Sequence, residues 1–302
     1  MFTISVPASS ANIGPGFDSA GVAVSRYLTL QVEEAPEWKF THLNETIPPV
    51  RHYTDHYIYI VAQQVAVWHD VSLPPCHVKM HSDIPLARGL GSSASAIVAG
   101  IELANQLCEL DLTEKEKFAY AVKIEGHPDN VAAALFGGFV VTVKMNEEAS
   151  YKKLPAIDTD LVVYIPNFEL KTEDARQVLP KDFLMKDAAT ASGVSNLMIS
   201  ALLTGDYELA GKMMESDLFH ESYRAVLIPN YFDIRSEARK LGAFGTVISG
   251  AGPTMISFVP HGQGADIAQE MGKLFSEYEV AALKLDEKGL QVHQDVPLVE
   301  KE

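Results

Sequence analysis

The sequence has little cysteine, no long apolar run and no excess of positive charge. Only Cys76 and Cys108 occur among its 302 residues, which excludes a disulfide framework and is typical of a reducing cytoplasm. No apolar run approaches the roughly 20 residues that a membrane-spanning helix requires. Residues 1–6 show no basic segment before an apolar one, so we expect no signal peptide. We therefore expect a cytoplasmic protein without a membrane partner.

The net charge of −16 argues against a nucleic-acid partner, because neutralising phosphates requires a surplus of Lys and Arg. Apolar residues make up 47% and charged residues 21% of the chain, which is an ordinary globular mixture. The length suggests about two domains. A chain this acidic that binds a phosphate compound must use local donors and a metal ion, because its overall field repels anions.

A glycine-rich stretch, 85–96, lies between a predicted strand at 76–81 and a predicted helix at 97–107. Gly89 and Gly91 stand where the chain would turn, and serines stand where the helix would begin. The first N–H groups of a helix lack intrahelical partners and form an anion site with the helix dipole. The stretch is not a Walker A loop, because it lacks Gly-Lys-Ser/Thr. It predicts a nucleotide-phosphate loop, although small residues here also suit close helix–sheet packing.

A second run of turn-forming residues, 7–18, lies between predicted strands at 2–6 and 22–32. It contains two prolines, two glycines, an asparagine and an aspartate, and almost no large apolar side chain. This composition predicts a long surface turn rather than part of the core.

Glu125 closes a predicted helix that opens with a capping box at 113–116 and stops at Gly126. A carboxylate in the last turn opposes the helix dipole, which is a mild indication of function. Three more polar residues follow at once: His127, Asp129 and Asn130. A lone glutamate is usually a solvated residue, and Asp129 could be no more than a helix cap. Four clustered polar groups are harder to explain by packing.

The polar stretch 146–160 marks an expected boundary between domains at 1–150 and 151–302. Beyond it the patterns predict strands at 161–165, 245–249, 255–259 and 280–285. They also predict helices at 188–204, 207–215 and 265–278, and one that ends at 241. The histidine pairs at 52/56 and 77/81 lack the context of a zinc helix, so we interpret them as ordinary surface or core residues.

Three glycine-bearing loops in this order resemble the three motifs of the GHMP small-molecule kinases. Residues 85–96 match the second, phosphate-binding motif, and 249–254 match the third. Within this superfamily the segments 7–18, 125–132, 172–176 and 220–224 resemble the homoserine kinases in particular. The resemblance covers nearly the whole chain. It departs at Ala87, where many members have Gly, and at Ala133, where relatives often have Pro.

This resemblance implies an α+β fold, the GHMP kinase fold. An ATP-binding N-terminal domain (1–150), similar to domain 2 of ribosomal protein S5, would join a ferredoxin-like C-terminal domain (151–302). The implied reaction is ATP-dependent phosphorylation of the L-homoserine hydroxyl to O-phospho-L-homoserine, in threonine biosynthesis, with ATP and Mg²⁺. Ser93 and Glu125 would hold Mg²⁺. The triphosphate would lie on Pro85, Leu86, Ala87, Arg88, Gly89, Leu90, Gly91, Ser92, Ser93, Ala94 and Ser95.

The resemblance also implies an amino-acid pocket, lined by Asn12, Asp18, His127, Asn130, Thr172, Arg176 and Arg224. A zwitterion needs a carboxylate clamp, for which arginine is best suited, and an acceptor for its ammonium, for which we expect Asp18. Asn130 would aim the hydroxyl at the γ-phosphate and would form the catalytic set with Ser93 and Glu125. We expect Asp18 to bind substrate rather than to act as a base.

Two alternatives stay open. The first is another GHMP kinase that acts on mevalonate or a related alcohol, which two arginines plus an ammonium acceptor disfavour. The second is a catalytically silent relative that binds a nucleotide or a metabolite, which the complete loop, Ser93 and Glu125 disfavour. For each arginine taken alone, a surface salt bridge is the ordinary explanation, and Arg88 would face either a phosphate or solvent. A homodimer is expected because it is common in the family.

Overall fold

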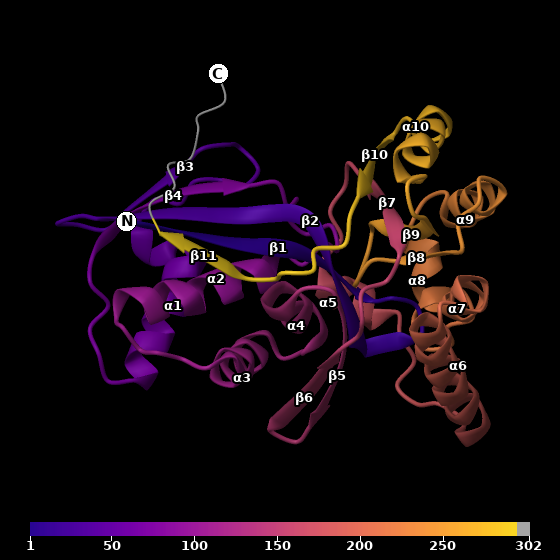
Figure 1. The fold of residues 1–302 in the computed structure, drawn as a ribbon, viewed down its shortest axis with the longest axis horizontal. Helices are drawn as coiled ribbons and strands as arrows, with labels where there is room; N and C mark the ends of the chain where they lie inside the picture. The colour runs from indigo at the N-terminus through magenta and orange to yellow at the C-terminus, as the bar shows by residue number, and fades with distance from the viewer. Residues whose placement is uncertain (295–302) are drawn as a thin grey trace.

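Two sheets, each with helices packed on it, form the two lobes of the computed structural model (Figure 1). The structure describes residues 1–294, and the end of the expected second domain, 295–302, lies outside the described residues. Within 1–294, no helix is both long enough and apolar enough to cross a bilayer.

The first sheet has seven strands, with the order β11–β1–β2–β4–β3 and a hairpin of β5 and β6 attached to β2. All its pairs are antiparallel except β3 and β4. Its strands are β1 (Phe2–Asn12), β2 (Gly16–Glu34), β3 (Lys39–His42), β4 (Cys76–Ser82), β5 (Phe139–Met145), β6 (Glu148–Lys153) and β11 (Gln291–Gln294). The long strand β2 pairs with β5 near its start and with β4 near its end.

Four helices cover one face of this sheet, together with a short 3₁₀ turn, η1 (Tyr53–Asp55). They are α1 (Tyr57–Trp68), α2 (Ser92–Leu107), α3 (Glu114–Glu125) and α4 (Asp129–Phe136). The predicted capping box of α3 is confirmed, since the N–H of Glu116 donates to Thr113 Oγ1 at 3.2 Å and the N–H of Thr113 donates to Glu116 Oε2 at 2.9 Å. Gly126 ends α3 with φ +90°, also as predicted.

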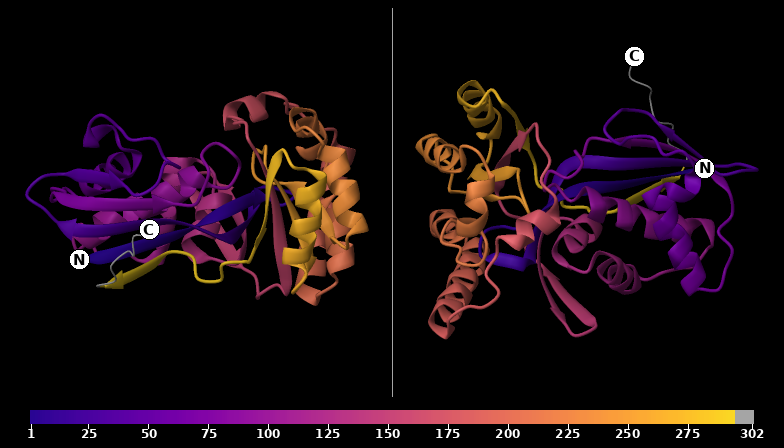
Figure 2. Two further views of the ribbon diagram at one scale, coloured as in Figure 1. Left: turned by 90° about the horizontal axis from the view of Figure 1, so that it is seen from above. Right: turned by 180° about the vertical axis from the view of Figure 1, so that it is seen from behind.

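The second sheet has the order β10–β7–β9–β8 and is wholly antiparallel. Its strands are β7 (Thr159–Pro166), β8 (Gly245–Ile248), β9 (Met255–Pro260) and β10 (Tyr278–Leu283). The helices of this lobe are α5 (Thr172–Gln177), α6 (Met185–Thr204), α7 (Tyr207–Met214), α8 (Glu221–Arg224), η2 (Ala225–Leu227), α9 (Tyr231–Lys240) and α10 (Gly264–Leu274). Figure 2 shows α6, α7, α9 and α10 on the outer side of this sheet, away from the first lobe.

The expectation of a surface turn at 7–18 is wrong. β1 continues to Asn12 and β2 begins at Gly16, so that only a short turn separates two long strands. Residues 7–16 are all buried. The small side chains that resembled a turn instead allow α2 to approach the sheet, where Ser95 Oγ donates to the carbonyl of Pro7 at 2.8 Å.

Three short strands escaped prediction, namely β3, β6 and β11. Their sequences are largely polar, so no local pattern marks them. β3 and β11 pair with strands from distant parts of the chain, and β6 pairs with the neighbouring β5 in a hairpin. β11 returns from the far end of the chain to pair with β1, and it lies beside β1 in Figure 1. The expected division at residue 150 falls inside β6, and it stays a prediction.

Candidate active site

The predicted phosphate loop connects β4 to α2. Gly91 is the N-cap of α2, with φ +70°, and the helix begins at Ser92, so its first N–H groups face the loop. A Cβ on Gly91 would lie 2.1 Å from Ser9 Oγ, and one on Gly89 would lie 2.3 Å from the carbonyl oxygen of Ser249. Neither position has room for a side chain, because β1 and the 249–254 turn press against the loop.

Other loop residues differ in what they offer a ligand. Ala87 has φ +51°, a conformation that favours Gly, which gives a physical reason for the Gly of other members at this position. Arg88 lines the site cavity and donates to the carbonyls of Pro166 and Leu86 at 3.1 and 3.0 Å. Ala94 and Ser95 are completely buried. Leu90 is also buried, whereas Ala87 is exposed.

Ser93 and Glu125 meet as predicted at the end of α3. Ser93 Oγ donates a hydrogen bond of 2.9 Å to Glu125 Oε2, although the two residues are 32 positions apart. Burial raises the pKa of the Glu125 carboxyl, and the hydrogen bond from Ser93 opposes this effect. A cation beside the pair would favour the carboxylate. A hydroxyl and a carboxylate form the oxygen donor set that Mg²⁺ prefers.

A pair of opposite charges lies at the other end of the site. Arg176 Nη2 donates to Asp18 Oδ1 at 2.7 Å, and each side chain is 36% exposed. Asn12 Oδ1 accepts from the N–H of Asp18 at 3.1 Å, while Asn12 Nδ2 donates to the carbonyl of Gly250 at 2.7 Å. Asn12 therefore joins the start of β2 to the 249–254 turn and holds Asp18 in place.

Among residues 1–294, Arg224 is the largest side chain that is fully buried. Its Nε donates to the carbonyl of Ala175 at 3.0 Å and its Nη1 to that of Gly250 at 3.1 Å. Burial, and then the nearby cation of Arg176, lower the pKa of Arg224 to about 10, so it stays protonated at neutral pH. The Phe17 ring lies 5.5 Å from the guanidinium of Arg176 and 5.4 Å from that of Arg224.

One cavity of about 150 Å³ is lined by residues from both ends of this site. All the residues predicted for the amino-acid pocket line it, as do both predicted magnesium ligands. Of the predicted phosphate loop, Leu86, Ala94 and Ser95 do not line it. The charges of an amino acid and of a phosphate thus have complementary groups within a single space.

Comparisons with known proteins agree with this geometry. The family model for the N-terminal domain of GHMP kinases matches residues 56–138, and that for the GHMP kinase C-terminal region matches 198–277. A homoserine kinase from Oceanobacillus iheyensis is 50% identical, over 97% of this chain and 99% of that protein. One from Streptococcus sanguinis is 47% identical, over 96% of this chain and 99% of that protein.

The chain belongs to the homoserine kinase family of GHMP kinases. The crystal structure of homoserine kinase from Cytophaga hutchinsonii superposes with a TM-score of 0.84 at 28% identity, covering 96% of each chain. L. major mevalonate kinase, with a TM-score of 0.72 and 18% identity over 94% of this chain and 95% of that one, shares the fold. The predicted GHMP kinase fold is confirmed.

Two polar residues of this GHMP kinase were missing from the predicted site. Asp129 lines the cavity and is buried; burial, and then the charge of Asp18, raise its pKa to about 7. Ser9 Oγ donates to Asn130 Oδ1 at 2.9 Å and so fixes the orientation of that amide. Asp129 resembled a helix cap in the sequence, and its position between Glu125 and Asn130 was the signal to notice. Ser9 had no signal beyond a run of small residues.

The 249–254 turn was recognised as a motif but was given no site role. Its Gly250 and Ala251 line the cavity. Ser249 Oγ donates to the carbonyl of Gly89 at 2.5 Å, and the N–H of Gly250 donates to the carbonyl of Ala11 at 3.0 Å. This turn therefore holds the phosphate loop against the end of β1.

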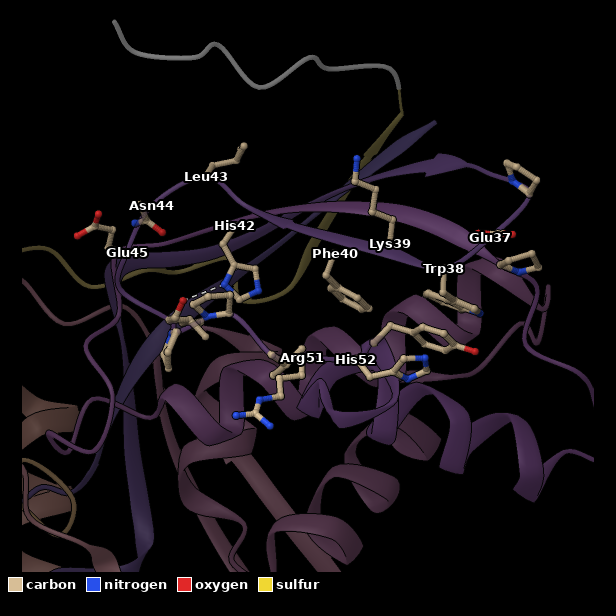
Figure 3. Close-up of a pocket in the computed structure, with 17 residues that line it drawn as sticks. Glu37, Trp38, Lys39, Phe40, His42, Leu43, Asn44, Glu45, Arg51 and His52 are labelled. Atoms are coloured by element: carbon tan, nitrogen blue, oxygen red, sulfur yellow. Dashed lines mark hydrogen bonds between the residues drawn. The ribbon is translucent and has the colours of Figure 1, made fainter.

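A larger cavity of about 1250 Å³ opens along β3. Figure 3 shows Trp38, Phe40 and His42 pointing from this edge toward Arg51 and His52 on the opposite wall. The Trp38 and Phe40 rings stack with centroids 6.1 Å apart. The cavity is thus lined by aromatic faces with a cation at one side.

The start of α1 lies between this aromatic cavity and the phosphate loop. η1 forms part of the cavity wall, and α1 begins two residues later at Tyr57. Burial raises the pKa of Tyr57, and the nearby Ser93 side chain opposes the rise. His56, between them, stacks on Phe40 with centroids 3.9 Å apart, and burial lowers its pKa to about 4. His56 is therefore a neutral ring at neutral pH.

Proposed function

We propose that this chain transfers the γ-phosphoryl group of ATP to the side-chain hydroxyl of L-homoserine, giving ADP and O-phospho-L-homoserine. The observation that carries the proposal is the cavity in which an accessible helix N-terminus and a set of opposite charges face the same space. The family's placement in threonine biosynthesis agrees with this product. Phosphoryl transfer depends on positioning and charge neutralisation more than on covalent chemistry by the protein.

The phosphates of ATP would lie on the loop at 85–95, where the free N–H groups at the start of α2 point toward them. Ser93 and Glu125 fit a magnesium ion, because their oxygens are 2.9 Å apart. Burial destabilises the charged form of Glu125, and a bound cation would stabilise it. A bound Mg²⁺ would supply positive charge against the phosphate oxygens. The nearby aromatic cavity would take the adenine base, stacked on Trp38 or Phe40.

The amino acid would enter by replacing the ion pair between Asp18 and Arg176 with two pairs of its own. Its ammonium would bind Asp18, and its carboxylate would bind Arg176 and Arg224. An exposed ion pair contributes only about 0–1 kcal/mol, so separating Asp18 from Arg176 costs little. The substrate charges gain charge-assisted hydrogen bonds in exchange. A zwitterion therefore suits this pocket better than mevalonate, which has no ammonium.

Asn130 would hold the hydroxyl of the substrate. Because Oδ1 of Asn130 already accepts from Ser9, the amide offers its Nδ2–H groups, which can bind the hydroxyl oxygen but cannot take its proton. The hydroxyl oxygen would form the new bond to the γ-phosphorus as the bond to the β-phosphate oxygen breaks. The hydroxyl proton would leave with the phosphoryl group or pass to solvent.

A coupled assay of ADP release tests this proposal. Purified protein with ATP and Mg²⁺ should turn over L-homoserine, and should leave mevalonate and phosphomevalonate unchanged. Turnover of mevalonate in preference to homoserine would identify the other kind of GHMP kinase. ATP binding with no turnover of any of the three alcohols would instead support a silent relative.

The cellular setting is part of the same proposal. Both cysteines are free thiols, one buried and one partly exposed, and this supports a cytoplasmic location. We propose a homodimer because homodimers are common in the family. Light scattering on the purified chain tests this, since a dimer of the 33.0 kDa chain has a mass of about 66 kDa (2 × 33.0).

A further inference from the structure

His220 lies completely buried behind the amino-acid pocket. It precedes α8, the short helix that carries Arg224. Nδ1 of His220 is 3.3 Å from Nη1 of Arg224, and Nε2 is 2.9 Å from the carbonyl oxygen of Gly14. Its ring stacks on Phe17, with centroids 5.4 Å apart. One histidine thus touches the arginine, the turn before β2 and the aromatic ring beside both arginines.

The partners of His220 fix where its proton lies. A guanidinium has only donors, so Nδ1 of His220 must accept from Arg224 and carries no proton. The carbonyl of Gly14 has only lone pairs, so Nε2 must carry the proton and donate it. Both contacts are therefore satisfied by one form of the ring, the neutral Nε2–H tautomer. Burial lowers the pKa of His220 to about 4, which agrees with this form.

None of the groups around His220 pairs with a charged imidazolium. Asp217 Oδ2 accepts from the backbone N–H groups of His220 and Glu221, both at 2.8 Å, and lies 3.8 Å from Nε2. Asp217 thus caps the start of α8 instead of pairing with an imidazolium. Among residues 1–294, Nη2 of Arg224 has no hydrogen-bond partner, whereas its Nε and Nη1 are held by Ala175, Gly250 and His220. The one free nitrogen is the one left for a ligand.

We propose that His220 is a positioning residue for amino-acid recognition: its Nε2–H tautomer ties the Arg224 guanidinium to the turn before β2 and so fixes the free nitrogen that binds the substrate carboxylate. The proposal rests on the proposed function, because it takes Arg224 as part of the carboxylate clamp. It predicts that weakening the His220–Arg224 contact affects homoserine binding and leaves ATP binding alone.

Two amide substitutions separate the two contacts. In His220→Asn the amide oxygen can take the place of Nδ1 and accept from Arg224, while the link to Gly14 is lost. In His220→Gln the amide nitrogen can take the place of Nε2 and donate to Gly14, while the acceptor for Arg224 is lost. Both lose the ring that stacks on Phe17, so a packing effect is common to the two. His69→Gln is the control, since His69 bonds Tyr120 and does not line the cavity.

Steady-state kinetics with homoserine and ATP give the decisive readout. H220Q should raise KM for homoserine about tenfold, as expected for a lost hydrogen bond to a charged group, with kcat and KM for ATP little changed. H220N should raise it much less, and H69Q not at all. Equal effects of H220N and H220Q would mean that His220 acts only through packing, and would overturn the proposal. An unchanged KM of H220Q for homoserine would overturn it as well.

Nitrogen-15 NMR of histidine-labelled wild-type protein gives an answer even if a variant does not fold. His220 should show a protonated Nε2 and an unprotonated Nδ1 from pH 6 to 8. A protonated Nδ1, or an imidazolium, would contradict the proposal. If wild-type protein does not phosphorylate homoserine, the proposed function fails; if it does and these signatures are absent, only the role of His220 fails.

Discussion

Replacing Asp18 by Asn tests whether this carboxylate recognises the substrate ammonium. In the free protein the change breaks the 2.7 Å pair with Arg176, but both side chains are 36% exposed. Such pairs are worth about 0.2–1 kcal/mol, so the melting temperature should fall by less than about 4 °C. In the complex the change removes a hydrogen bond to a charged group, worth about 1.5–3 kcal/mol. We therefore expect KM for homoserine to rise about 10- to 100-fold.

The same substitution separates recognition from base catalysis. Loss of a general base lowers kcat by about 10²–10⁴, whereas loss of an ammonium acceptor acts mainly on KM. The coupled ADP assay with homoserine and with 4-hydroxybutyrate, which lacks the ammonium, measures both. D18N should not weaken the use of 4-hydroxybutyrate, because that compound has no group for Asp18 to bind. A severe loss of kcat with an unchanged KM for homoserine would refute the reasoning.

Three further substitutions test other parts of the account. G91A should lose ATP turnover, because its Cβ would meet Ser9 Oγ at 2.1 Å, whereas G205A, with φ +73° and open space, should lose only about 1 kcal/mol of stability; equal activities would contradict this. E125Q should lower kcat about 10²- to 10³-fold and weaken the Mg²⁺ dependence; an unchanged Mg²⁺ titration would count against the metal role. Burial raises the pKa of Glu221 from 4.5 to about 7, so the native state binds more protons between these values and its unfolding free energy falls as pH rises through them. In urea unfolding, the unfolding free energy of E221Q should fall less steeply with pH than that of wild-type protein, by at most about 1.4 kcal/mol per pH unit. Identical pH profiles of the two proteins would contradict the assignment.

Local signals predicted the local parts of the site well. The capping box at Thr113, the stop at Gly126 and the glycine loop before α2 each depend on neighbouring residues, and the structure contains all three. The meeting of Ser93 with Glu125 followed from the family resemblance, since no periodicity relates positions 32 apart.

Non-local contacts explain most of what the sequence did not predict. Residues 7–12 resemble a turn by composition, but their small side chains serve a buried strand against which α2 packs. β11 is recognisable only through its pairing with β1. Arg88 donates to the carbonyl of Pro166, 78 positions away, a contact that no local pattern predicts. Each case depends on a partner that sequence patterns do not reveal.

We propose that one cavity passes the γ-phosphoryl group of ATP to the hydroxyl of homoserine. Phosphorus-31 NMR of purified protein with ATP, Mg²⁺ and L-homoserine tests it most directly, because it observes the product itself. ADP and a phosphomonoester coupled to a CH₂ group should appear in equal amounts. The release of inorganic phosphate alone, or a phosphomonoester formed from mevalonate but not from homoserine, would contradict it.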